Sequence, residues 1–167
     1  SCCYNRYFFT YNSDTMDQGN HDYTLHPLII DSTIKTYKIG NVILYKNEEG
    51  AEIISRVLGL PGDTFEIQNG TIIVNTIPLN IHIGHAKIGG ETVFESYVQK
   101  LGNHLENVGS AKEIFHMNLA SFEVAADEII VVPDNWMRGE IEAVSLDNIE
   151  GVVLGYDDNA YKSEWSA

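Results

Sequence analysis

Short hydrophobic runs separated by turn-forming residues dominate the chain, and this is the pattern of an antiparallel β protein. Five runs rich in β-branched and aromatic residues occur at 28–30, 42–45, 52–58, 65–67 and 71–74. Asn69-Gly70, between the last two runs, is a strong signal for a tight hairpin turn, and residues 47–50 read as the loop of another hairpin. Strands this short and this closely spaced predict a mainly β fold.

The hydrophobic period changes between residues 80 and 127. There, apolar residues recur at steps of three and four, which predicts an amphipathic helix interrupted by Gly102: Phe94, Tyr97, Val98, Leu101 and Leu105. The segment then continues to Phe115, and strand patterns return at 128–132 and 151–154. The sequence therefore predicts a β core formed by 27–79 and 128–156, with an inserted cap subdomain at 80–127 that contains a helix.

The two ends of the chain differ from this core. Residues 1–26 form an N-terminal arm with an aromatic cluster made of Tyr4, Tyr7, Phe8, Phe9 and Tyr11. Exposing that much aromatic surface is unfavourable, so we expect the arm to dock on the body or on a partner. Exchange of the arm between two copies would give a homodimer. Residues 157–167 are expected to form a loosely held C-terminal tail.

The charge balance limits the classes of partner. Ten basic residues against 24 acidic ones give a formal net charge of -14, which repels phosphate backbones and disfavours nucleic acid as a partner. No apolar run is long enough to span a bilayer. His82 and His85 have the spacing of metal ligands, but no third ligand follows at a useful distance. We expect neither a metal nor a cofactor.

The most specific string in the chain is Arg56-Val57-Leu58-Gly59-Leu60-Pro61-Gly62-Asp63. Pro61 fixes φ and Gly62 permits a positive φ, so the string predicts a strand that ends in a tight turn. It resembles the lysine-containing motif of type I signal peptidases, in which a Lys-Arg pair leads into a Gly-Leu-Pro-Gly-Asp turn.

Three flanking segments resemble the same family and fall in the family's order. Residues 39–45 are similar to the strand before the turn, residues 13–16 (Ser-Asp-Thr-Met) to the nucleophile motif, and Asp134-Asn135 to the start of the last motif. The resemblance implies a signal-peptidase-like antiparallel β core. It assigns a structural role to the motif residues Arg56, Gly59, Pro61, Gly62, Asp63, Asp134 and Asn135.

The residues that carry the family's chemistry differ here. Signal peptidases use a serine nucleophile and a lysine general base, whereas the lysine position in this chain is Ser55 and the nucleophile position is Thr15, or Asp14 or Asp17 if the alignment shifts. Residues 136–140 (Trp-Met-Arg-Gly-Glu) also replace the Ser-x-Asp-Ser-Arg segment of the family. A hydroxyl group cannot act as a general base near neutral pH. We therefore expect a catalytically inactive protein, with degenerate positions at Asp14, Thr15 and Ser55.

The resemblance also implies what remains after the chemistry is lost. A signal peptidase binds its substrate as an added β-strand, and the matching groove here would be lined by Asp14, Thr15, Met16, Ile53, Ser55 and Val57. The double loss is similar to that of signal-peptidase-like proteins that assist pilus assembly in Gram-positive bacteria. This implies a pilin or sortase partner at the extracellular face of the cytoplasmic membrane, with an N-terminal helix before Ser1 as tether.

Two alternatives stay open at the level of sequence. Thr15 could be the nucleophile of an active peptidase of altered mechanism, with a base such as His26. The chain could also be a structural module that only dimerises through its N-terminal arm.

Overall fold

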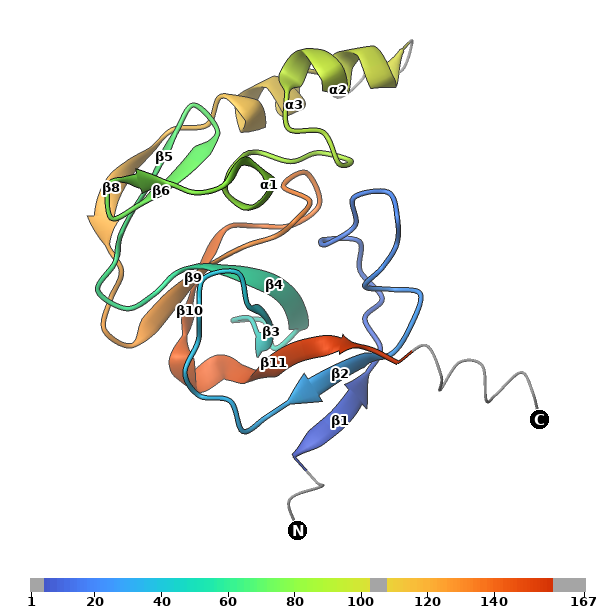
Figure 1. Cartoon of the computed structure of the whole chain (residues 1–167), viewed down its shortest axis with the longest axis vertical. Coiled ribbons are helices and arrows are strands. Elements are labelled where there is room, and N and C mark those ends of the chain that lie inside the picture. The colour runs from blue at the N-terminus through green and yellow to red at the C-terminus, as the bar shows by residue number, and fades with distance from the viewer. Residues whose placement is uncertain (1–4, 103–107, 158–167) are drawn as a thin grey trace, which may run out of the picture.

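The larger of two sheets has seven strands, and each neighbouring pair is antiparallel. The computed structural model describes residues 5–102 and 108–157. The strand order is β1-β2-β11-β3-β4-β9-β10 (Figure 1). The bounds are β1 Arg6–Phe9, β2 Leu28–Asp31, β3 Val42–Lys46, β4 Glu52–Gly59, β9 Glu128–Val132, β10 Glu142–Ser145 and β11 Ile149–Tyr156.

The smaller sheet has four strands in the order β7-β6-β5-β8. These are β5 Thr64–Gln68, β6 Thr71–Val74, β7 Ile77–Pro78 and β8 Leu119–Glu123. The predicted hairpin joins β5 to β6, and both Asn69 (φ 50°) and Gly70 (φ 76°) adopt the positive φ that its tight turn requires. The expectation of a mainly antiparallel β fold is confirmed.

Short helices lie beside the smaller sheet in the upper part of Figure 1. α2, Phe94–Leu101, coincides with the predicted amphipathic helix and ends at Gly102, whose φ is 59°. α3, Val108–Phe115, forms the continuation, and Leu105 lies outside the described residues. α1, Ile81–Gly84, and a 3-10 turn, η3 Leu146–Asn148, were not predicted. No helix in the described ranges is long and apolar enough to cross a membrane.

The smaller lobe is larger than the cap expected at 80–127. Its sheet takes strands from both sides of residue 80, because β8 returns after the helices to pair with β5. A core of buried residues fills the space between the sheets, and it includes Leu58, Phe65, Phe115, Ile130 and Trp136. The domain boundaries predicted for the arm, the core and the cap remain predictions.

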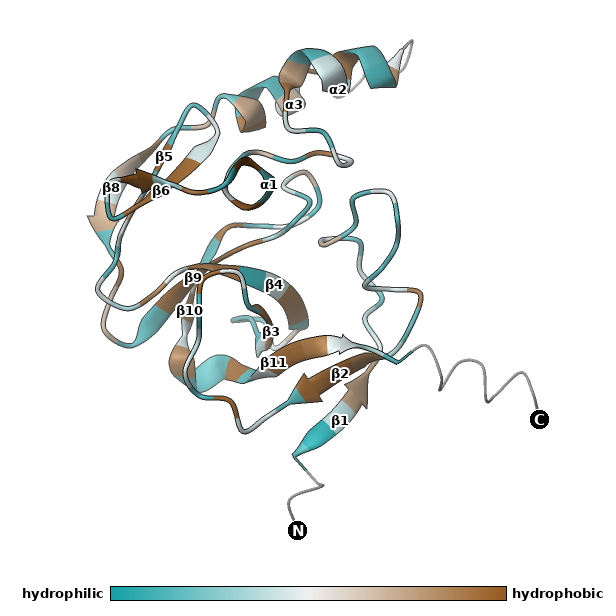
Figure 2. Ribbon diagram, in the orientation of Figure 1, coloured by the Kyte–Doolittle hydropathy of each residue, from teal (hydrophilic) through white to brown (hydrophobic). Residues whose placement is uncertain are grey.

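Two further clusters cover the faces of the larger sheet. Ile43, Val57 and Val131 belong to one cluster, and Tyr11, Met16 and Ile54 to the other. Figure 2 shows hydrophobic residues within β2 and β11. Part of the N-terminal arm docks on this body, since β1 pairs with β2 and Tyr11 is buried. Tyr4 and residues 158–167 of the predicted tail lie outside the described residues.

The Pro-Gly turn after β4 fastens the two sheets together. The Asp63 carboxylate accepts a hydrogen bond from the Leu60 N–H at 2.9 Å, which closes the turn, and Gly62 has the expected positive φ of 83°. Gly62 N–H donates to Val124 O at 2.9 Å, and Val124 N–H donates to Asp63 O at 2.8 Å. The chain therefore enters and leaves the smaller lobe through two segments bonded to each other.

Candidate functional site

Arg56 connects β4 to the segment that follows β9. Its Nε and Nη2 each donate to an Asp134 carboxylate oxygen at 2.8 Å, and its Nη1 donates to Gly40 O at 2.8 Å. Such a two-point contact between guanidinium and carboxylate is both strong and directional. The hydrogen bonds from Arg56 to Asp134 raise the pKa of the guanidinium further above its ordinary value. This pair fixes the position of the last motif relative to the strand that carries Ser55.

Asn135 holds the Thr15 segment of the arm against the chain that follows β9. Its backbone N–H donates to Thr15 O at 2.9 Å, and its side-chain Nδ2 donates to Asp17 O at 2.8 Å. Its Oδ1 accepts from the Met137 N–H at 3.0 Å. The residues that the sequence placed in separate motifs are thus brought together in space.

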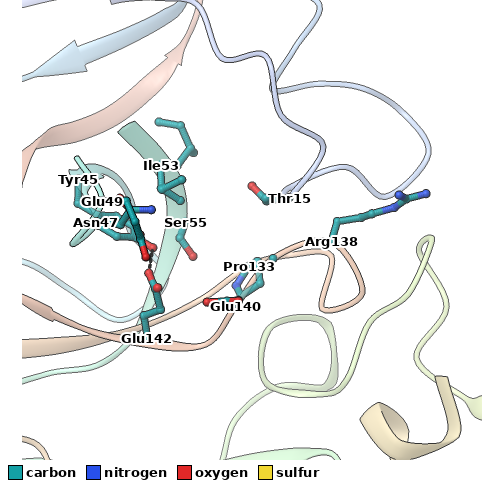
Figure 3. A pocket seen from close by; sticks show the side chains of 12 residues that line it. Thr15, Tyr45, Asn47, Glu49, Ile53, Ser55, Pro133, Arg138, Glu140 and Glu142 are labelled. Carbon is teal, nitrogen blue, oxygen red and sulfur yellow. Dashed lines mark hydrogen bonds between the residues drawn. The ribbon is translucent and has the colours of Figure 1, made fainter. Parts of the chain in front are cut away.

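A cavity of about 320 Å³ opens between these segments (Figure 3). Thr15 lies on one side, Ile53 and Ser55 line it from β4, and the opposite wall comes from the segment between β9 and β10. The full lining is Thr15, Tyr45, Asn47, Glu49, Ile53, Ile54, Ser55, Pro133, Arg138, Gly139, Glu140 and Glu142. Three predicted groove residues therefore line the cavity.

The other three predicted groove residues lie elsewhere. Asp14 is exposed and its carboxylate lies 3.5 Å from Arg138 Nε. Met16 and Val57 are buried in the two clusters that cover opposite faces of the larger sheet. Met16 still supports the site, because its Sδ accepts from the Asp134 N–H at 3.3 Å.

The cavity lies where the larger sheet stops short of a complete pairing. β4 and β9 pair from Gly59–Ile130 to Arg56–Val132. The residue that follows Val132 is Pro133. Proline has no N–H to donate, so it ends the ladder. Within the described part of the chain, Ile53–Ser55 has a strand partner only on the β3 side. This leaves a place for one more extended segment beside β4.

These features can be compared with known proteins. Residues 6–140 match the signal peptidase family, peptidase S26. The chain belongs to the signal peptidase family. Among solved structures, a signal peptidase I from Enterococcus faecalis V583 is similar, with a TM-score of 0.50 and 19% sequence identity over 72% of this chain and 98% of that chain. This likeness shows a shared fold. No curated protein matches the chain.

Thr15 and Ser55, which the sequence resemblance predicts at the nucleophile and base positions, each carry a hydroxyl group. Thr15 is 9% exposed, and its Oγ1 lies 2.6 Å from the hydroxyl of Tyr11. Ser55 is 1% exposed, and its Oγ has no hydrogen-bond partner among the described residues. Of the residues that line the cavity, none is lysine or histidine. The acid–base side chains that line the cavity are instead the carboxylates of Glu49, Glu140 and Glu142.

The histidines that the sequence singled out lie outside this cavity. His26 stacks on Tyr156 at the end of β11, with ring centroids 5.0 Å apart. His85 Nδ1 lies 2.8 Å from Thr71 Oγ1, and burial lowers the pKa of His85. In the described ranges, neither His82 nor His85 belongs to a group of three metal-ligating side chains.

Several cavity residues were not predicted from the sequence. Tyr45 donates from its hydroxyl to Glu142 Oε2 at 2.6 Å, although the two residues lie on β3 and β10, with two strands between them. Burial and the Glu142 carboxylate raise the pKa of Tyr45. The sequence placed Glu49 only in a hairpin loop and Glu140 only in the segment that replaces a family motif. The excess of acidic residues was the one sequence signal that pointed toward them.

Proposed function

We propose that this signal peptidase family member does not cleave peptides and instead binds them in an extended form. The observation that carries the proposal is the pair of hydroxyl groups at the two catalytic positions, Thr15 and Ser55. Serine–lysine catalysis needs a neutral amine beside the nucleophile, and the hydrogen bond of Thr15 goes to Tyr11 instead.

Binding would use the incomplete pairing of the larger sheet. An added peptide strand gains main-chain hydrogen bonds from an open sheet edge, and side-chain pockets give it specificity. Ile53–Ser55 supplies such an edge beside Pro133, and the cavity lined by Thr15, Ile53 and Ser55 supplies a pocket. Because Ser55 is nearly fully buried, only a side chain of the ligand would reach it.

We further propose that the ligand is a pilin or a sortase component, and that binding assists assembly of a surface pilus. The proposed location is the extracellular face of the cytoplasmic membrane, with an N-terminal helix as tether. The support is the simultaneous loss of the nucleophile and the base, which resembles the pilus-associated relatives of signal peptidases.

Cleavage of a fluorogenic signal-peptide substrate tests the first part of the proposal. We expect wild type to be as inactive as Thr15→Ala, both measured beside an active signal peptidase. Binding of the same peptide, in uncleavable form, should be detectable by fluorescence anisotropy. Cleavage by wild type that Thr15→Ala abolishes would reject the proposal in favour of an active peptidase that uses Thr15.

Site-specific photo-crosslinking tests the partner. A photoreactive residue at Ile53, at the cavity, should capture a pilin or sortase from cells that assemble pili. The same residue at Phe122 on exposed β8 is the matched control. Equal capture from both positions, or capture of neither protein, would reject the pilin and sortase assignment.

A further inference from the structure

The cavity beside β4 is acidic on one side. Glu49, Glu140 and Glu142 all line it, and Glu49 and Glu140 are exposed. A second hollow of about 350 Å³ shares Tyr45, Asn47, Glu49 and Glu142 with the first and adds Glu48 and Glu128. These two adjoining hollows, which share four lining residues, are called the acidic groove.

The basic residues that border this groove are directed to other partners. Arg138 contacts Asp14 at 3.5 Å, and Figure 3 shows its guanidinium pointing away from Ser55. Lys46 contacts Glu150 at 3.6 Å. No other lysine or arginine lines either hollow in the described part of the chain. The glutamates of the groove consequently face a space without a neutralising cation.

Ser55 provides independent evidence that the cavity suits a polar group of a ligand. Its hydroxyl lines the cavity, is 1% exposed, and has no hydrogen-bond partner among the described residues. Buried hydroxyl groups are normally hydrogen-bonded, and leaving one unpaired is unfavourable. In Figure 3 the Ser55 oxygen is directed toward the Pro133 and Glu140 side of the cavity.

We propose that the cavity binds the side-chain ammonium group of a lysine in an extended peptide. This inference rests on the proposed function and names the chemistry of the ligand. The ammonium group carries three N–H donors and no acceptor, which suits the free Ser55 hydroxyl together with the carboxylates of Glu140 and Glu142. Ser55 is shorter than a lysine, so the ligand would supply the cation that the chain lacks.

The arrangement favours a lysine over a bare metal ion. No group of three His, Cys, Asp or Glu side chains in the described residues is close enough to hold a metal. A metal would need such a compact set of ligands, whereas a long side chain can pass between separated carboxylates. Tyr45 also orients Glu142 through its hydroxyl, which fixes one carboxylate before the ligand arrives.

The experiment compares short capped peptides of alternating alanine and threonine that differ only at one central residue. The central residue is lysine, norleucine, arginine or glutamate, and binding to the wild-type protein is measured by fluorescence anisotropy. We expect the lysine peptide to bind about tenfold more tightly than the norleucine peptide at low salt. Added sodium chloride should weaken the binding of the lysine and arginine peptides and leave the binding of the norleucine peptide unchanged.

Variants connect the preference to the cavity. Glu142→Gln and Glu140→Gln should each reduce the ratio of lysine to norleucine affinity, whereas Glu123→Gln on β8 should leave it unchanged. Ser55→Ala should lower the affinity for the lysine peptide without affecting the norleucine peptide. Because Glu140 is exposed, its variant keeps the test valid if Glu142→Gln fails to fold.

The possible results separate the two proposals. Equal affinity for the lysine and norleucine peptides would overturn the lysine site and leave peptide binding in place. Tighter binding of the arginine peptide than of the lysine peptide would also overturn the assignment to lysine. If no peptide binds to wild type, the proposed function itself fails, and the lysine site with it.

Discussion

Single side chains join segments of this protein that lie far apart in sequence. Arg56 and Asp134 are the clearest case, since their side chains are only 22% and 11% exposed and share two hydrogen bonds. Asn135 does the same work for the Thr15 segment through its backbone and its amide. The shape of the cavity therefore depends on a few polar contacts.

Replacing Arg56 by methionine should lower the free energy of unfolding by about 2 kcal/mol, because Asp134 would stay partly buried without its partner. Urea denaturation of Arg56→Met, Asp134→Asn and the double variant measures the coupling. Lys46→Met removes the more exposed pair with Glu150 and should change stability by about 0.5 kcal/mol or less. A loss no larger than that of Lys46→Met would contradict the role given to Arg56.

Gly139 lies in the wall of the cavity without room for a side chain. A Cβ at this position would lie 2.7 Å from Pro133 Cβ and 3.1 Å from Thr15 Cβ. Gly139→Ala should cost about 2 kcal/mol through this overpacking. Gly109→Ala in α3, where a Cβ would meet nothing within 4 Å, should instead raise stability by about 0.5 kcal/mol. Thermal denaturation of both variants gives the comparison, and equal shifts would refute the crowding at Gly139.

Residues in continuous motifs were predictable, and residues paired across the sheet were not. The string from Arg56 to Asp63 carries its own backbone requirements, so its turn followed from the sequence. The contact between Tyr45 and Glu142 depends on strand order, which no local pattern contains. The hydrogen bond between Tyr11 and Thr15 depends on how the arm folds back, and it was missed for the same reason.

At the scale of elements, three of the four strands that the sequence missed are mostly exposed, namely β1, β7 and β8, whereas β10 contains the buried Val144. β8 is exposed along its whole length, so it lacks the alternation that marks a half-buried strand. β1 is exposed at three of its four positions and read only as an aromatic arm. The buried strands β3, β4 and β9 were predicted because their β-branched runs are nearly continuous.

β1 should be the least stable strand of the larger sheet. It lies at the edge and pairs only with β2, and its side chains bury little apolar surface. Hydrogen exchange followed by mass spectrometry should show faster exchange in β1 than in β11, which is paired on both sides. Protection of β1 equal to that of β11 would indicate that something else covers this edge, such as a second copy of the chain.

At the scale of the whole molecule, the net charge is -14, and Glu150 is one carboxylate that lies beside another, Glu52. Burial and the neighbouring Glu52 raise the pKa of Glu150, against the opposing effect of Lys46. A carboxyl group whose pKa is higher in the folded state stabilises the fold below its unfolded pKa. That contribution is lost as the pH rises through the folded pKa.

Glu150→Gln should therefore gain stability relative to wild type as the pH rises from about 4 to 7. The melting temperatures of both proteins across this range test the sign. Glu113→Gln, on the exposed side of α3, is the control. Its difference in melting temperature from wild type should vary less with pH. A difference for Glu150→Gln that falls with rising pH would contradict the raised pKa.

The pairing around β2 also determines how the molecule would carry mechanical load. β1 and β11 flank β2, and Arg6 and Val152 face Asp31 while Phe9 and Tyr156 face Leu28. β1 therefore begins, and β11 ends, at opposite ends of β2, so tension applied between Arg6 and Tyr156 would shear both ladders along their length. The smaller lobe, entered and left through the bonded pair Gly62 and Val124, stands outside this line of force.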